Sequence, residues 1–411
     1  MASSPASPAS QVLSARERLV HIDIVRGFAV FGLLWSNLNA GFFQGQLSSP
    51  DVVAHWASTV FSGGKFWTLF SLLFGATLAM QMERADVAQE PLANRWLRRM
   101  LVLFGIGWAH ALLVWPGDIL RSYALAGTIL ILFRRLSNRV VLIAAVAMLS
   151  LGASRQSFSE IATRIARVDV QAVQRREQAS PEQERVRRAY EDVYRNGSYL
   201  ENVRARFRLQ VSEWRRRASP PAGPLNWIDP SVLGLFLLGL VIGRAKMLQR
   251  PSEHHRALIV AIVAGFGVGI PLNVAVAVRL WVSHQGLFSM VHVLARLLLA
   301  LGYIGGLLWL TTRPEWPRRL RWLAPVGRLG LTNYIAQTAF VTFVKQHWGL
   351  GLEPVLGWFA CFALAIAFYV AQIAVSHWWV RHFTLGPVEW LWRRFTNGAP
   401  RHPRPSLAQA T

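Results

Sequence analysis

Long apolar runs separated by short clusters of arginine are the feature that most restricts how this chain can fold. A helix of roughly 17–25 apolar residues is long enough to cross the hydrocarbon core of a bilayer. About ten runs approach this length, with cores at residues 22–40, 59–81, 97–115, 118–134, 139–153, 229–247, 256–278, 289–311, 325–345 and 353–380. The chain is therefore predicted to be all-α, a polytopic transmembrane bundle of about ten helices.

The composition agrees with a chain embedded in lipid. Of its 411 residues 53% are hydrophobic and 16% are charged, which is too apolar for a soluble protein of this length. The net charge of +23 comes mostly from arginines scattered over short loops, so we expect a lipid bilayer, and no nucleic acid, as partner. The single cysteine, Cys361, excludes an internal disulfide, and the His254–His255 pair has no third ligand in view, so no metal site is expected.

Every second loop is basic, and this alternation predicts the orientation. Under the positive-inside rule the basic loops and both termini are cytoplasmic. The run from Val140 to Gly152 is short enough to be re-entrant, but the later basic loops would then lie outside, so we expect it to span. The basic loops contain Arg16 and Arg18; Arg84, Arg95, Arg98 and Arg99; Arg134, Arg135 and Arg139; Arg244, Lys246, Arg250 and Arg256; Arg313, Arg318, Arg319 and Arg321; and Arg381, Arg393 and Arg394.

A polar excursion divides the membrane region into two halves. Residues 154–224 are rich in arginine and glutamate, and a segment of this length is exempt from the charge rule. We expect an extracytoplasmic, mostly helical insertion, either a solvated cap or a surface that binds an acceptor or a partner. The predicted domains are a disordered tail (1–15), five helices (16–153), the insertion (154–224), five more helices (225–398) and a C-terminal tail (399–411).

A histidine and an aspartate flank a tight turn between two of the apolar runs, in the sequence GWAHALLVWPGDILRSYALAG. An ionisable group at membrane depth costs about 2.5–3.5 kcal/mol, so His110 and Asp118 are expected to pair, to face a cavity or to take part in chemistry. The alternatives are a histidine satisfied by a neighbouring carbonyl, and an aspartate satisfied by Arg121 three residues later.

Three further polar groups are ambiguous from the sequence. Lys65 starts the second span, where it can reach the membrane interface or bind substrate. His55 precedes it in a loop and reads as a surface histidine. Asp23 and Arg26, three residues apart on the first helix, can neutralise each other, or Arg26 can also bind an anionic ligand from the cytoplasm.

The third apolar run can connect two sites on opposite faces of the membrane. His110 follows Arg98 by twelve residues, about 18 Å of helix rise. Arg95, Arg98 and Arg99 can therefore hold the charged end of a long, thin donor while its reactive end approaches His110. His110 has the chemistry of a general base, and Asp118 that of a group that orients it, so acyl transfer is the reaction we expect.

Five motifs, in order, resemble the YeiB-like family of bacterial inner-membrane proteins, and the resemblance extends from about residue 16 to 398. They are LVHIDIVRGFAVFGLLWSN; GGKFWTLFSLLFGA; RRMLVLFGIGWAHALLVWPGDILRSYALAG; VGRLGLTNYIAQT; and GPVEWLWRRFTNG. That family is grouped more remotely with transmembrane acyltransferases such as heparan-alpha-glucosaminide N-acetyltransferase, which moves acetyl groups from cytosolic acetyl-CoA to a sugar amine on the far side. In that enzyme an outer-loop histidine is catalytic, and His55 lies in a roughly corresponding loop.

The expected function is therefore transfer of an acyl group across the bacterial inner (cytoplasmic) membrane. Cytosolic acyl-CoA, most simply acetyl-CoA, would be the donor, bound near Asp23, Arg26 and the arginines of the third run. An envelope glycan or lipid would be the acceptor, His110 or His55 the base, and Lys65 or Arg121 would stabilise oxyanion charge. The alternative is a transporter or lipid-handling protein without bond-making chemistry. The sequence leaves open a homo-oligomer.

Overall fold

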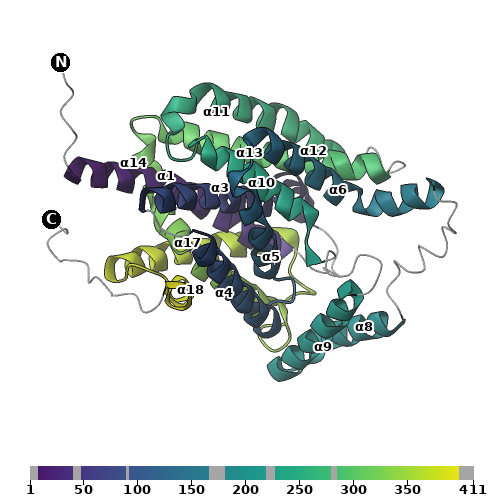
Figure 1. Ribbon diagram of the computed structural model, residues 1–411. Helices are drawn as coiled ribbons and strands as arrows, with labels where there is room; N and C mark the ends of the chain where they lie inside the picture. Colours follow the sequence, from purple (N-terminus) through teal and green to yellow (C-terminus); the bar gives the residue numbers. More distant parts are fainter. Residues whose placement is uncertain are drawn as a thin grey trace, which may run out of the picture.

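The computed structural model describes residues 8–39, 48–88, 92–165, 181–218, 227–278 and 285–397. Within these ranges the chain is helical, without a strand, and most of its helices pack side by side in one bundle (Figure 1). The predicted all-α helical bundle is confirmed.

The helices include the apolar runs expected from the sequence, together with further helices outside those runs. In chain order they are α1 (Pro8–Asn39), α2 (Ser49–Ala57), α3 (Lys65–Ala88), α4 (Leu92–Leu113), α5 (Leu120–Leu130), α6 (Asn138–Ile165), α8 (Pro181–Asn196), α9 (Tyr199–Ala218), α10 (Pro230–Arg244), α11 (His255–Ile262), α12 (Ile270–Ala277), α13 (Gln285–Thr311), α14 (Trp316–Leu320), α15 (Ala324–Arg328), α16 (Gly330–Lys345), α17 (Trp358–His382) and α18 (Pro387–Asn397). A π-helical turn, Val263–Gly269, joins α11 to α12. Helix α1 begins inside the segment expected to be a disordered tail. Residues 1–7 and the expected C-terminal tail lie outside the described residues.

Three helical segments of the described chain are long and apolar enough to cross a bilayer by length and composition: Pro251–Ala277, Phe288–Thr311 and Trp358–His382. Two shorter apolar helices, Asn138–Ala153 and Pro230–Arg244, accompany them. Large apolar side chains also remain exposed on the bundle, among them Leu101, Ile143 and Val370. Exposed apolar area of this extent is favourable in lipid and unfavourable in water, so the chain is a membrane protein.

Glycines set the closest helix contact, between α3 and α10. A Cβ atom on Gly239 would overlap the carbonyl oxygen of Leu72, and one on Gly243 would lie 2.7 Å from the Cβ of Ala79. Small residues let helices approach closely where lipid provides no hydrophobic driving force between them. Because residue 239 meets 72 and residue 243 meets 79, α3 and α10 run in the same direction.

The first helices alternate in direction, which gives the bundle two distinct ends. Ser36 and Ser62 share a hydrogen bond of 2.6 Å, and Arg26 donates to Thr77 at 3.0 Å, so α1 and α3 are antiparallel. Helix α4 then returns alongside α3. We call the end with Ser62 and His110 the histidine end and the end with Thr77 and Arg26 the arginine end.

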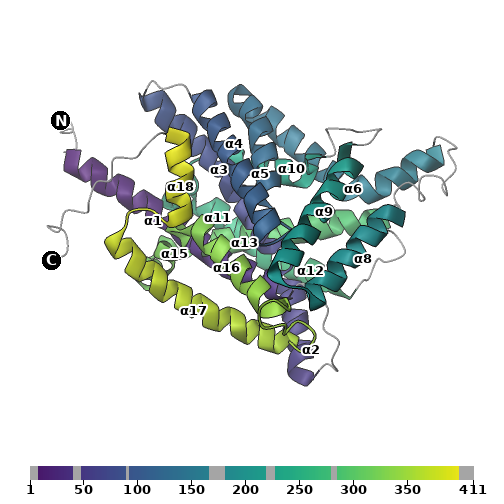
Figure 2. The same ribbon diagram turned by 90° about the horizontal axis from the view of Figure 1, so that it is seen from below.

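The α8–α9 hairpin packs against the histidine end (Figure 2). Arg206 of α9 donates to the carbonyl of Leu113 and to the Gln346 side chain, both at 2.7 Å. Tyr199 donates to the same Leu113 carbonyl at 3.1 Å. The described part of the polar insertion is therefore bonded to the last turn of α4 and to the end of α16.

Substituting Gly239 with alanine should destabilise the protein, because the new methyl group would meet the α3 backbone. Overpacking of this kind typically costs about 1–3 kcal/mol. Gly105→Ala is the matched control, since a Cβ there meets no atom within 4 Å and alanine favours the helix by up to about 1 kcal/mol. Thermal unfolding in detergent compares the two variants, and equal melting temperatures would contradict the glycine contact as a determinant of packing.

Candidate active site

His110 lies between a carboxylate and a hydroxyl at the histidine end. Its Nδ1 is 2.8 Å from Oδ1 of Asp118, and its Nε2 is 2.8 Å from Oγ1 of Thr338. The three residues come from the last turn of α4, the turn before α5 and the middle of α16. The side chains of His110 and Asp118 are 1% and 0% exposed. The expected pairing of His110 with Asp118 is present, and Thr338 is an addition.

The carboxylate of Asp118 is held on its second oxygen as well. The Arg121 amide donates to Oδ2 at 3.0 Å, and the Arg121 Nε lies 3.6 Å from the same atom. Gly107, one turn before His110, leaves room for the carboxylate, since a Cβ there would lie 2.8 Å from Oδ2. Asp118 therefore has three roles: it accepts a backbone amide at the start of α5, it pairs with the Arg121 side chain, and it orients the His110 ring.

Arg121 connects this group to the insertion. Its Nη1 donates to Oε1 of Gln210 on α9 at 2.5 Å, and its guanidinium lies over the Trp108 ring, 4.9 Å from the centroid. Gln210 in turn donates to the Pro116 carbonyl at 3.1 Å. The α9 helix is thus hydrogen-bonded to the turn that carries Asp118.

A carboxylate, a histidine and a hydroxyl follow one another in this hydrogen-bonded group. The same order of residue types is found in nucleophilic and general-base sites. With Asp118 ionised, Nδ1–H of His110 donates to the carboxylate, which leaves Nε2 to accept from the Thr338 hydroxyl. Thr338 also lies within hydrogen-bond distance of the carbonyls of Tyr334 and Ile335. The geometry therefore lets Nε2 of His110 either accept from or donate to the Thr338 hydroxyl, while Asp118 orients the ring through Nδ1.

Sequence reasoning missed Thr338, although it is the last residue of the motif VGRLGLTNYIAQT. Other polar residues of this motif connect helices. Gln337 donates to Gln372 at 2.8 Å, and Asn333 donates to Ser376 at 3.1 Å, which ties α16 to α17. The motif itself was the available signal, but only the packing of α16 on α4 assigns Thr338 to His110.

Lys65 belongs to a second group of polar residues. Its side chain is buried, and Nζ donates to the Thr59 carbonyl at 2.6 Å. The charge that acts on it most strongly is that of Arg296 on α13, and His292 lies near both. Neither Arg296 nor His292 was singled out from the sequence, because both lie inside an apolar run that reads as an ordinary span.

His55 lies in a different contact, between α2 and α17. Its ring centroid is 4.3 Å from that of Trp358 in an edge-on arrangement. Next to it Asp51 accepts the Phe359 amide at 3.0 Å, and hydrogen bonds from Ser48 and Phe359 lower the pKa of this carboxyl below its usual value. The described contacts of His55 thus lie where α2 packs against the start of α17.

The arginine end brings together most of the residues expected to bind the donor. Arg26 hydrogen-bonds Thr77 and lies 3.6 Å from Asp23. Arg99 donates to Gln81 at 3.0 Å. The positive charges within electrostatic range of Arg99 are those of Arg26, Arg84, Arg95 and Arg393. Arg98 is exposed, on a different face of α4, because consecutive helical residues point about 100° apart.

Helix α18 also contributes to this arginine cluster, which the sequence did not predict. Its Trp392 ring lies under the Arg99 guanidinium, 4.6 Å from ring centroid to Cζ. Its Glu389 accepts the amides of Leu331 and Thr332 at 2.8 and 3.0 Å, at the start of α16. Burial and the nearby charge of Arg328 lower the pKa of Arg393. The C-terminal motif therefore serves both to cap α16 and to extend the arginine cluster.

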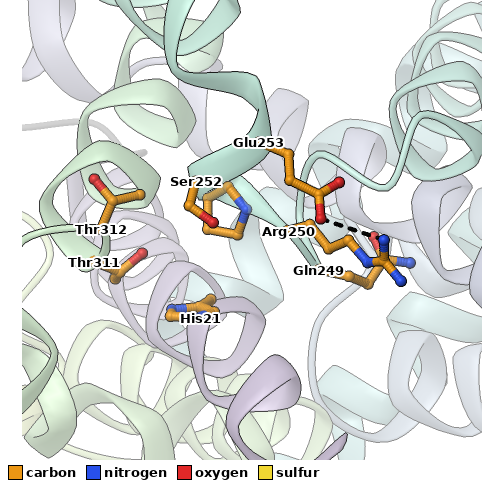
Figure 3. Close-up of a pocket in the computed structure, with 8 residues that line it drawn as sticks. His21, Gln249, Arg250, Ser252, Glu253, Thr311 and Thr312 are labelled. Carbon is orange, nitrogen blue, oxygen red and sulfur yellow. Dashed lines mark hydrogen bonds and ion pairs between the residues drawn. The ribbon is translucent and has the colours of Figure 1, made fainter. Parts of the chain in front are cut away.

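A cavity of about 450 Å³ lies beside α1 and the end of α13 (Figure 3). Its polar lining includes His21, Gln249, Thr311 and an ion pair of 3.3 Å between Arg250 and Glu253. None of the residues predicted to act in the reaction lines it. In the described chain, no three or more His, Cys, Asp or Glu side chains gather in a group that could hold a metal ion.

The fold and these two ends describe a helical membrane protein, and comparison with known proteins places it in a family. Residues 242–399 match the model of a family described as "Protein of unknown function (DUF418)". YxaH of Bacillus subtilis (strain 168) is 30% identical over 92% of this chain and 94% of its own length. YeiB of Escherichia coli (strain K12) is 28% identical, covering 92% and 96%. The chain belongs to this YeiB-like family. No solved structure matches it significantly.

Proposed function

We propose that this protein is an integral membrane acyltransferase that moves an acyl group, most simply acetyl, from cytosolic acyl-CoA to an extracytoplasmic hydroxyl or amine. The observation that carries the proposal is the buried His110, held between Asp118 and the Thr338 hydroxyl. The arginine cluster at the opposite end of the same helix supports it. A histidine that needed only to be satisfied would not require a carboxylate at membrane depth.

The proposed orientation has the arginine end in the cytoplasm and the histidine end outside, in the inner membrane of a bacterium. The alternating helix directions and the basic loops support it. Both termini are then cytoplasmic, the chain crosses the membrane several times, and α8 and α9 are extracytoplasmic.

The donor would bind at the arginine end through its phosphates. Arg26, Arg95 and Arg99 provide charge from two helices, and Arg84 and Arg393 add to it. Planar guanidinium groups suit phosphate oxygens. From Arg99 to His110 the α4 helix rises about 16 Å, so the thin arm of the donor would have to extend along α4 to place its thioester near His110.

The chemistry would be direct transfer. His110 Nε2 removes the proton from the acceptor hydroxyl or amine as that atom attacks the thioester carbonyl carbon. The carbon–sulfur bond then breaks, and the thiolate takes the proton from the imidazolium. Asp118 stabilises the imidazolium between the two steps. Arg121 lies 3.6 Å from Asp118, whereas the hydrogen bond of Lys65 goes to the Thr59 carbonyl, so we assign oxyanion stabilisation to Arg121.

The alternative is a transporter or lipid-handling protein. The hydrogen bonds of Gln337 with Gln372 and with the Val30 carbonyl form a buried polar connection between α16, α17 and α1 that a path for a polar solute would use. The two functions differ in one respect: only the enzyme breaks a thioester.

Topology is tested by cysteine accessibility at two matched surface positions. Arg188 and Arg319 are exposed, and each pairs with a glutamate four residues earlier. Arg319 also lies over the Trp316 ring. In spheroplasts, a membrane-impermeant maleimide should label Arg188→Cys at once and Arg319→Cys only after permeabilisation. Labelling of Arg319→Cys alone before permeabilisation would show the opposite orientation. Equal labelling of both would contradict the alternation of cytoplasmic and extracytoplasmic loops.

Donor binding is tested by comparing adjacent arginines of α4. Replacing Arg99 and Arg393 with glutamine should weaken acetyl-CoA binding about 10- to 100-fold and reduce its salt dependence, since charged hydrogen bonds to phosphate are lost. Arg98→Gln, which removes an exposed charge from the same helix, should change affinity by less than about threefold. Calorimetry on the purified protein gives both values. Similar losses in the two variants would show that general positive charge, and not this cluster, attracts the donor.

Catalysis is tested by comparing the two histidines. His110→Ala should reduce acyl transfer at least about a hundredfold while donor binding is retained, because a general base contributes about 10²–10⁴-fold. The rate of acyl transfer by Asp118→Asn should lie between that of His110→Ala and that of the wild type. His55→Ala should reduce the rate by less than about tenfold. The assay follows labelled acyl groups from CoA into envelope fractions of vesicles. An inactive His55→Ala with an active His110→Ala would move the base to α2, and no transfer by the wild type would favour the transporter.

A further inference from the structure

Lys65 and Arg296 form a cationic pair that the proposed transfer does not use. Lys65 is 2% exposed, and Arg296 is the twelfth residue of α13. The Arg296 guanidinium lies over the Trp67 ring, 5.5 Å from its centroid. Each charge lies within electrostatic range of the other.

The backbone around this pair is shaped to admit the arginine. Gly64 has a positive φ of 80°, and a Cβ at this position would lie 2.5 Å from Cδ of Arg296. Any other residue there would be strained and would displace the arginine side chain. The position of Arg296 is therefore built into the start of α3 and is not the chance outcome of a long surface side chain.

The pair lacks a direct counter-charge. In the described chain no carboxylate oxygen lies within 4 Å of either cation, and the Arg296 Nε is buried without a hydrogen-bond acceptor. The acidic residue whose charge acts on Arg296 is Asp229, which is exposed at the N-terminus of α10 and accepts the Ser231 amide. Of the segments outside the described residues, 40–47, 219–226 and 279–284 contain no aspartate or glutamate in their sequence, and 166–180 contains Asp169 and Glu177.

Lys65 is buried and Arg296 is partly buried, so the two like charges repel each other with reduced hydration, and a negative ligand would stabilise both. An ammonium and a guanidinium together match a tetrahedral oxyanion, since the guanidinium offers planar donors and the ammonium a point charge. Lys65 Nζ donates one hydrogen bond, to Thr59, and keeps two donors free of any described partner.

We propose that Lys65 and Arg296 bind a phosphate group, as a phosphate ester or a lipid phosphodiester, at the histidine end. Lys65 starts α3, and His110 lies in the last turn of the antiparallel α4, so the phosphate site and the candidate active site share this end. They are also connected through contacts. Tyr123 donates to the Trp67 carbonyl at 3.1 Å, and Tyr334 packs on the His110 ring at 5.3 Å. If the proposed function holds, this site selects a phosphate-bearing acceptor.

The test measures anion binding without acyl-CoA, so that it succeeds or fails separately from the transferase proposal. The full-length protein in neutral detergent is titrated with inorganic phosphate and, separately, with short-chain phosphatidylglycerol, with phosphatidylcholine as the zwitterionic comparison. Native mass spectrometry and calorimetry give the affinities. The variants are Lys65→Gln and Arg296→Gln. The matched control is Arg313→Gln, because Arg313 also lies over a tryptophan ring, at 4.3 Å from Trp309, beyond the other end of α13.

The expected result is a loss of at least about tenfold in anion affinity for Lys65→Gln and Arg296→Gln, the loss of one charge-assisted hydrogen bond. Arg313→Gln and His110→Ala should bind as the wild type does. Saturation by inorganic phosphate would identify a free phosphate or phosphate ester, and binding of phosphatidylglycerol alone would identify a lipid headgroup. Equal affinity in all variants, or equal binding of phosphatidylcholine, would overturn the proposal.

A stability measurement separates an anion site from a purely structural arginine. In anion-free detergent, Arg296→Gln removes an uncompensated charge, so its melting temperature should equal or exceed that of the wild type. Added phosphate should raise the melting temperature of the wild type but not of the variant. A variant that melts lower in the absence of anion, with phosphate stabilising both proteins alike, would assign Arg296 a structural role and end the proposal.

Discussion

The rest of this structure depends on one constraint: a polar side chain inside an apolar bundle must find its partner within the protein, because lipid offers none. His110 meets this constraint through Asp118 and Thr338, and the amide nitrogen of Gln337 meets it through Gln372. These hydrogen bonds join α4, α16 and α17 more specifically than apolar contacts can, since each fixes a direction as well as a distance. Lys65 and Arg296 have no carboxylate oxygen within 4 Å in the described chain, and the Arg296 Nε has no hydrogen-bond acceptor, which is why they prompt a hypothesis of ligand binding.

Helix α4 relates the two chemically distinct ends of the bundle. Its first turns carry Arg95 and Arg99, and its last turn carries His110. A straight helix holds these groups at a constant separation, so a ligand bound at one end reaches the other only if its length matches the helix rise. The α8–α9 hairpin bonds to the carbonyl of Leu113 and to Arg121 at the histidine end. The α8–α9 hairpin is therefore part of the surroundings of His110.

The C-terminal helix α18 shows how one short motif can serve two parts of a fold. The carboxylate of Glu389 satisfies the free amides at the start of α16, the helix that supplies Thr338. One turn later, Trp392 stacks under Arg99, and Arg393 joins the arginine cluster. The arginine end and the helix that completes the His110 group are thus stabilised by the same eleven-residue segment. This segment lies within the part of the chain that matches the family model.

The sequence by itself determined the helices, because a run of apolar residues in lipid can satisfy its backbone only as a helix. It singled out His110 and Asp118 on either side of one tight turn, but left open whether they pair with each other or with other groups. It also located the arginines of α4. Only the tertiary structure decided that Thr338, 228 residues from His110, completes the group, that Arg296 approaches Lys65, and that Arg393 joins Arg99 while the adjacent Arg98 does not. These contacts depend on which faces of distant helices meet. Periodicity within a helix specifies an apolar face, but in a membrane most faces are apolar, so the packing partner is chosen by glycines and polar groups that act only once the helices are together.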